Sequence, residues 1–184
     1  MISRQLALVV ILAAGAMNGL RADEVPPAYR LIAREYAIPA ALFYALALTE
    51  SGQSSRSQAR LRPWPWTLNI GGQGQYFSSR KDAWLVLQRA LTNQERSVDI
   101  GLLQVNWRYR HSALGSSWQA LDPYHNLRVG AAILKRCYTA APDWQKSLGC
   151  YHAPNDLVRA AKYAARVTAH WRQITGESEQ DAPR

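Results

Sequence analysis

The segment from Pro39 to Glu50 constrains the fold more than any other part of the sequence, because it carries no charge before its last residue. Proline suits the first position of a helix, and Pro39 follows Ile38 where the preceding helical pattern ends. A helix that is apolar on every side is buried in the middle of a fold. We therefore expect a central buried helix that ends at Glu50, with Ser51-Gly52 as its stop.

The other residues predict a single, mainly helical domain with a small β part. Further helices are expected over 26–37, 80–91, 124–138 and 144–151, and a last helix reaches about residue 174. The expected helix caps are Ser79, Asp143 and either Asn155 or Asp156. The β part is expected from 63–70, which is extended, a turn over 71–74, a short strand over 75–77, and strand or turn over 97–104. Residues 53–61 are expected to be loop.

The first residues predict export. Arg4 precedes an unbroken apolar run over 6–14, which is too short to span a bilayer as a mature helix. Small residues at Ala14-Gly15-Ala16 and at Ala22 offer cleavage sites. We expect a secretory signal peptide over 1–22, with an uncleaved anchor as the alternative. A domain over 23–174 and a loose polar tail over 175–184 would follow.

The net charge of +9 indicates an acidic partner. Nucleic acid, anionic membranes and the anionic bacterial wall all attract a basic chain. Most of the positive residues are arginines, and they are scattered from Arg30 to Arg184 without a dense run. This diffuse charge, together with export, disfavours a nucleic-acid groove and favours work against an acidic polymer.

Cys137 and Cys150 are the two cysteines, and both follow the expected signal peptide. A pair of cysteines in an oxidising compartment is a candidate disulfide, and two buried free thiols are the alternative. The four histidines show no ligand spacing with these cysteines, so no metal site is expected.

Glu50 is the acidic residue whose position most favours chemistry. Burial disfavours the charged form of a carboxyl, and the negative end of the helix dipole also repels a carboxylate. Both effects raise the pKa, and a carboxyl that stays protonated near neutral pH can act as a general acid. The plain alternative is an ordinary solvated glutamate at a helix end.

Three short segments occur in order along the chain: Thr49-Glu50-Ser51-Gly52, then Gly101-Leu102-Leu103-Gln104-Val105-Asn106, then Cys150-Tyr151-His152-Ala153. This series resembles the family of lytic transglycosylases with a soluble-transglycosylase catalytic domain, related in fold to goose-type lysozymes. The resemblance covers roughly residues 28–171. It implies an α+β lysozyme-like fold in which the buried helix ends in the catalytic Glu50 and a small β hairpin edges the saccharide cleft. The implied substrate contacts are Ser51, Gln104, Asn106, Tyr151 and His152, and the Tyr151 hydroxyl would also hydrogen-bond Glu50.

The resemblance also implies a reaction on peptidoglycan. Glu50 would protonate the glycosidic oxygen between N-acetylmuramic acid and N-acetylglucosamine, and the muramoyl N-acetyl group would stabilise the positive charge. Glu50 would then take the proton of the 6-hydroxyl, which closes a 1,6-anhydro ring. A periplasmic monomer without metal or organic cofactor is implied.

The chain departs from the family pattern at three positions. Leu103 stands where methionine is usual, and His152 and Pro154 replace an asparagine and a glycine. The segment Trp64-Pro65-Trp66 and the long stretch to Asp99 resemble members that accompany conjugation and type IV secretion machinery. This implies a partner complex and local opening of the wall.

Several alternatives stay open at this stage. Asp99 could face Glu50 and support an inverting hydrolysis by a muramidase, or it could brace the turn before Gln104. Gln104 and Asn106 either bind substrate or hold the cleft wall. Three tryptophans offer sugar stacking or plain packing: Trp64, Trp66 and Trp107. An inactive glycan-binding component is the alternative to an enzyme.

Overall fold

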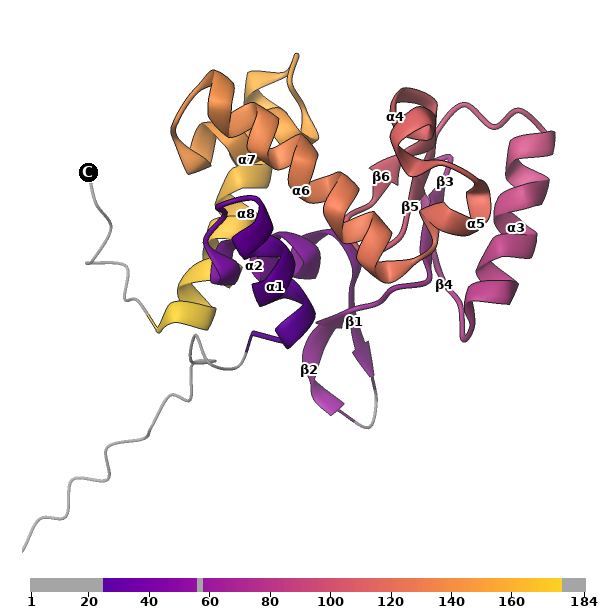
Figure 1. The fold of residues 1–184 in the computed structure, drawn as a ribbon, viewed down its shortest axis with the longest axis horizontal. Helices are drawn as coiled ribbons and strands as arrows, with labels where there is room; N and C mark the ends of the chain where they lie inside the picture. The colour runs from indigo at the N-terminus through magenta and orange to yellow at the C-terminus, as the bar shows by residue number, and fades with distance from the viewer. Residues whose placement is uncertain (1–24, 56–57, 177–184) are drawn as a thin grey trace, which may run out of the picture.

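The computed structural model describes residues 25–176 except 56 and 57 (Figure 1). At its centre lies α2 (Ala40–Ser51), in which every residue from Ala41 to Leu48 is buried. Pro39 precedes the helix as its N-cap, and the helix ends at Ser51, before Gly52. The expected central helix is therefore confirmed, with bounds shifted by one residue. The expected signal peptide and most of the expected tail lie outside the described residues.

Other helices of the described part surround α2 and extend away from it (Figure 1). They are α1 (Pro27–Glu35), α3 (Arg80–Thr92), α4 (Trp107–Leu114), α5 (Ser117–Ala120), α6 (Pro123–Ala140), α7 (Trp144–His152) and α8 (Leu157–Thr175). The caps Ser79, Asp143 and Asp156 are confirmed, because each side chain accepts a backbone N–H from three residues further on. The helix α8 packs along both α2 and α7.

In the residues that the structure describes, two antiparallel sheets form the β part. The first pairs β1 (Gly52–Ser55) with β2 (Gln58–Pro63), and the second has the strand order β4-β3-β5-β6. Its strands are β3 (Thr67–Ile70), β4 (Gln73–Tyr76), β5 (Val98–Ile100) and β6 (Val105–Asn106). The loop expected over 53–61 was wrong, because polar β1 and β2 lack the alternation of apolar residues that signals a strand. The turn before β4 is shorter than expected and needs only Gly71-Gly72, both at positive φ.

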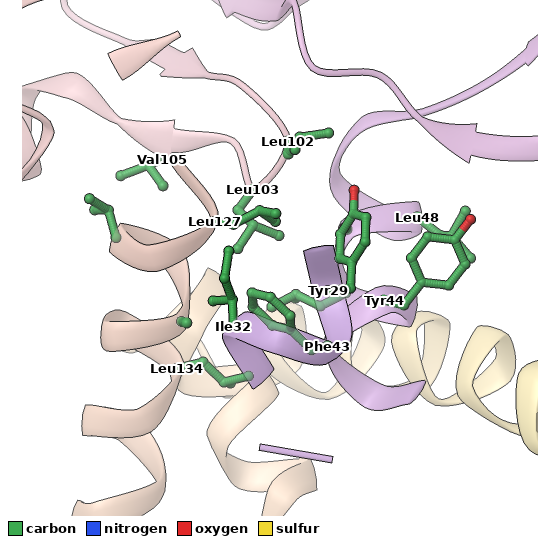
Figure 2. Packing of buried hydrophobic residues seen from close by; sticks show 14 of the residues in the cluster. Tyr29, Ile32, Phe43, Tyr44, Leu48, Leu102, Leu103, Val105, Leu127 and Leu134 are labelled. Carbon is green, nitrogen blue, oxygen red and sulfur yellow. The ribbon is translucent and has the colours of Figure 1, made fainter. Parts of the chain in front are cut away.

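The hydrophobic core joins the helices to the turn after β5. Figure 2 shows Ile32 and Phe43 of the first two helices together with Leu103 and Leu127. Leu103, which lies in that turn, is fully buried. The turn is therefore anchored by an apolar side chain beside the end of α2.

A disulfide between Cys137 and Cys150 ties α6 to α7, as the sequence predicted.

Within the described residues, no single helix is long and apolar enough to cross a membrane. The pair α1 and α2 has the length and composition together, but the two helices meet at 114° and α2 is a buried core helix. The chain thus has the mainly helical α+β fold expected for a lysozyme-like protein.

Candidate active site

Glu50 lies in the last turn of α2, where the buried helix reaches the β part. The residue is half-buried as a whole, and protein surrounds its carboxyl. The pKa of Glu50 is raised to about 7, mainly by burial and to a smaller extent by the charge of Asp99. A hydrogen bond from Tyr163 and the charge of Arg166 act in the opposite direction. The carboxyl is therefore poised between its protonated and ionised forms near neutral pH.

The Tyr163 hydroxyl donates the hydrogen bond to Glu50 Oε1. Tyr163 lies on α8 and is only 2% exposed. Burial first, and then the charge of Glu50, raise the pKa of Tyr163 well above its usual value. The hydroxyl hence stays protonated and can act only as a donor toward an ionised Glu50. Sequence reasoning missed this residue, because on an apolar helix face a tyrosine is indistinguishable from a core residue.

Tyr151 makes a different bond from the one expected. Its hydroxyl donates to the carbonyl oxygen of Leu103 at 2.7 Å, so its single proton does not reach Glu50. Burial raises the pKa of Tyr151, and the charge of Glu50 raises it further. Tyr151 is therefore close to the candidate acid although it does not bond it. The expected tyrosine–glutamate bond thus exists in this chain, but Tyr163 provides it.

Ser51 follows Glu50 and has no exposed surface. Its hydroxyl lies 2.8 Å from the carbonyl oxygen of Leu102 and 3.2 Å from that of Ala47. A side chain without accessible surface does not touch substrate, so this geometry contradicts the expected contact. Ser51 instead fixes the end of α2 against the turn after β5.

The turn after β5 is held from inside by Gln104, a residue at positive φ. The Gln104 Nε2 donates to the carbonyl oxygens of Gly101 at 2.8 Å and Thr67 at 3.3 Å. These two bonds give Gln104 a supporting role in the turn, next to the end of α2.

Asn126 of α6 completes the support of this turn. Its Oδ1 accepts the backbone N–H of Leu103 at 2.9 Å, and its Nδ2 donates to the carbonyl oxygens of Ile100 and Ala120. Gly101 lies against this amide at a φ of 79°, and a Cβ there would come within 2.6 Å of Asn126 Cγ. Asn126 escaped sequence reasoning, because its bonds reach residues distant in the chain.

Asp99 of β5 is clasped by two asparagines from the neighbouring strands. Asn69 Nδ2 donates to one carboxylate oxygen at 3.2 Å, and Asn106 Nδ2 donates to the other at 2.7 Å. The bracing role considered for Asp99 therefore exists. In the described part of the chain, the Oδ1 atoms of Asn69 and Asn106 are buried without a hydrogen-bond partner. Burial raises the pKa of Asp99, and the two amide bonds lower it.

Comparison with known protein families agrees with this arrangement. The family model described as the transglycosylase SLT domain matches residues 28–174. The chain belongs to this family. The membership gives peptidoglycan as substrate, lytic transglycosylase activity in general terms, and an extracytoplasmic location. Searches of curated proteins and of solved structures found no match.

In this SLT domain, His152 covers the tyrosine that bonds the candidate acid. The imidazole stacks on the Tyr163 ring, with centroids 4.2 Å apart and planes 2° from parallel. His152 is exposed, and burial of part of its ring followed by the charges of Arg159 and Arg166 lowers its pKa. A neutral, accessible ring therefore lies on Tyr163, the tyrosine that bonds Glu50. No three His, Cys, Asp or Glu side chains of the described residues are grouped so as to hold a metal ion.

The tryptophans of the SLT domain differ in how they are used. Trp64 Nε1 donates to the carbonyl oxygen of Phe77 at 2.7 Å, and its ring meets that of Trp66 edge to face. Trp66 packs against the core, and its buried Nε1 has no partner among the described residues. Trp107 also packs against the core, beside His111. These contacts favour packing as the main role of the three rings.

Proposed function

We propose that this SLT domain is a lytic transglycosylase that cleaves the β-1,4 bond between N-acetylmuramic acid and N-acetylglucosamine. The observation that carries the proposal is the state of Glu50. Its pKa lies about 7, and one hydroxyl donor, Tyr163, contacts it. A general acid that later serves as a base needs a pKa close to the working pH.

In the first step Glu50 donates its proton to the glycosidic oxygen. The bond from the muramoyl anomeric carbon to that oxygen breaks, and its electron pair stays with the leaving 4-oxygen of N-acetylglucosamine. The muramoyl N-acetyl oxygen stabilises the positive charge at the anomeric carbon, which is a recognised substitute for a second carboxylate. Tyr163 and Arg166 favour the ionised Glu50 that this step produces.

In the second step the Glu50 carboxylate takes the proton of the muramoyl 6-hydroxyl. The 6-oxygen bonds to the anomeric carbon, which closes the 1,6-anhydro ring and returns Glu50 to its protonated form. No water is consumed. Asn69 and Asn106 each donate a hydrogen bond to one oxygen of Asp99. These bonds support a role for Asp99 in holding the neighbouring strands and in setting the charge near Glu50.

Four of the expected contact residues are proposed to line the saccharide cleft: Gln104, Asn106, Tyr151 and His152. Asn106 is half-buried and donates its amide to Asp99, so it would contribute to the wall mainly by holding that carboxylate. His152 offers a neutral ring beside Tyr163. Gln104 and Tyr151 donate their hydrogen bonds to backbone carbonyl oxygens, so their proposed contribution is mainly to the shape of the saccharide cleft.

Product analysis tests the proposal. Purified sacculi are digested by the wild type, by Glu50→Gln and by Glu95→Gln, a matched control at an exposed position. The proposal predicts anhydro-ended muropeptides from the wild type and the control, and none from Glu50→Gln. Full clearing by a folded Glu50→Gln would exclude Glu50 as the acid, and binding of sacculi by the wild type without any clearing would leave a glycan-binding role instead.

A hydrolytic muramidase is the second candidate, because Asp99 is close enough to raise the pKa of Glu50. Reducing-end products, heavier than the anhydro products by one water, would support it.

The proposed setting is the periplasm, reached through a signal peptide over 1–22, where a monomer opens the wall locally for a conjugation or type IV secretion complex. The diffuse positive charge supports contact with the anionic wall. N-terminal sequencing of the exported protein tests the cleavage. A start at residue 1 in the envelope fraction would contradict the signal peptide.

A further inference from the structure

A cavity of about 450 Å³ opens along one face of α6, between the end of α1 and α4. Its charged lining includes Arg110, Arg128 and Arg136, and its apolar lining includes Ala113, Val129 and Ile133. No Asp or Glu lines it. We call this feature the arginine cavity.

The three guanidinium groups of the arginine cavity are unequally neutralised. Arg128 forms two bonds of 2.9 Å with Glu35. Arg110 and Arg136 have no acidic partner among the described residues. The pKa of Arg110 is lowered mainly by burial and also by the positive charge of Arg136, so the two guanidinium groups are close to each other. Two cations held together at a cavity wall repel each other, and an anion bound between them removes that repulsion.

The arginine cavity lies next to the candidate active site. The charge of Arg110 lowers the otherwise raised pKa of Tyr151, and the charge of Glu50 raises it. The contacts agree, because the disulfide joins Cys137, the neighbour of Arg136, to Cys150, the neighbour of Tyr151. The Tyr151 hydroxyl in turn bonds the turn after β5, which Ser51 joins to the end of α2. A molecule bound beside Glu50 could therefore place an anionic group in the arginine cavity.

We propose that the arginine cavity binds carboxylates of the stem peptide that hangs from the lactyl group of N-acetylmuramic acid. This inference rests on the proposed function. The stem peptide is short, carries several carboxylates and has small side chains, which match the guanidinium groups and the apolar patches of Ala113 and Ile133. Four extended residues reach up to about 14 Å, which suits a site adjoining the cleft.

The test compares glycan strands that carry stem peptides with strands stripped by an amidase. We expect the wild type to prefer the peptide-bearing strands by about tenfold in kcat/KM, the size of a hydrogen bond to a charged group. Arg136→Gln should lower this preference at least about fivefold, because it removes one such bond. Arg96→Gln, an exposed arginine outside the cavity, is the matched control and should keep the preference. Arg136 is exposed and lacks an acidic partner in the described part, so the variant should fold.

Binding of a free stem tetrapeptide to Glu50→Gln, followed by NMR, separates this inference from the proposed function. Shifts at Arg110 and Arg136 in Glu50→Gln, with the Arg110 shift lost in Glu50→Gln/Arg136→Gln, support the cavity even if no anhydro product is found. Lack of tetrapeptide binding, or an equal rate on both kinds of strand, would overturn it. Equal binding of an unrelated peptide of the same charge would also overturn it.

Discussion

The hydroxyl of Tyr163 bonds the carboxyl of Glu50 across 113 positions of the chain. Through this bond the last helix, α8, touches the end of the central helix, α2. His152 from α7 stacks on the same tyrosine ring. The protonation of the candidate acid thus depends on how three helices pack together.

Tyr163→Phe removes a hydrogen bond that lowers the pKa of Glu50. The pKa of Glu50 should rise, and the alkaline limb of the kcat profile should move to higher pH. A hydrogen bond to a charged group contributes about 1.5–3 kcal/mol, so kcat should fall about 10- to 100-fold. Tyr124→Phe, at an exposed tyrosine, is the control. An unchanged profile in Tyr163→Phe would show that the bond plays no part in the reaction.

Glu50→Gln should make the stability of the fold less dependent on pH. The Glu50 carboxyl ionises near 4.5 in the unfolded chain and at about 7 in the folded one, so the folded state binds more protons between these values. Its contribution is therefore present below pH 4.5 and is lost as pH rises to 7, by up to about 3 kcal/mol. Urea unfolding should find the variant more stable than wild type at pH 8, with little difference at pH 4. A difference that is constant with pH would contradict the raised pKa.

Asp99→Asn separates electrostatic support from base catalysis. The Asp99 charge raises the pKa of Glu50, so its removal should move the alkaline limb of kcat/KM to lower pH. The new amide can still accept one hydrogen bond and can donate to an unpartnered Oδ1 of Asn69 or Asn106. We expect less than about tenfold loss at pH 6, since general base catalysis is not removed. A loss above about a hundredfold, the contribution of a general base, would favour the hydrolytic mechanism.

Gly101→Ala should disrupt the turn that supports Glu50. The φ of Gly101 is 79°, and a Cβ would lie 2.6 Å from Asn126 Cγ. Backbone strain and overpacking should together cost about 2–4 kcal/mol, measured by urea unfolding, and activity should fall with it. Gly74→Ala, where a Cβ meets nothing within 4 Å, is the control and should change stability by less than about 0.5 kcal/mol. A fully stable Gly101→Ala would mean that the turn adapts freely.

The sequence predicted features that depend on neighbouring residues. The uncharged run before Glu50 predicted the buried helix, and the side chains of Ser79 and Asp143 predicted the helix starts that they cap. The raised pKa of Glu50 followed from the same run, because burial is its largest cause. These features need no knowledge of the tertiary fold.

Features that arise from distant pairings could not be predicted in the same way. The strands β1 and β2 are held together by backbone pairing of polar segments. The bonds of Tyr163 to Glu50 and of Asn126 to the turn join residues far apart in the chain. The burial of Ser51 depends on the turn that packs over the end of α2. In each case the tertiary contact, not the local pattern, decides the role.

The most direct test of the central claim is digestion of sacculi in water labelled with heavy oxygen. If the Glu50 carboxylate takes the proton of the 6-hydroxyl and the 6-oxygen closes the anhydro ring, the new muramoyl ends contain no label. Hydrolysis instead places one labelled oxygen on each new end. We predict unlabelled anhydro ends from the wild type and no new ends from Glu50→Gln; labelled reducing ends would contradict the account.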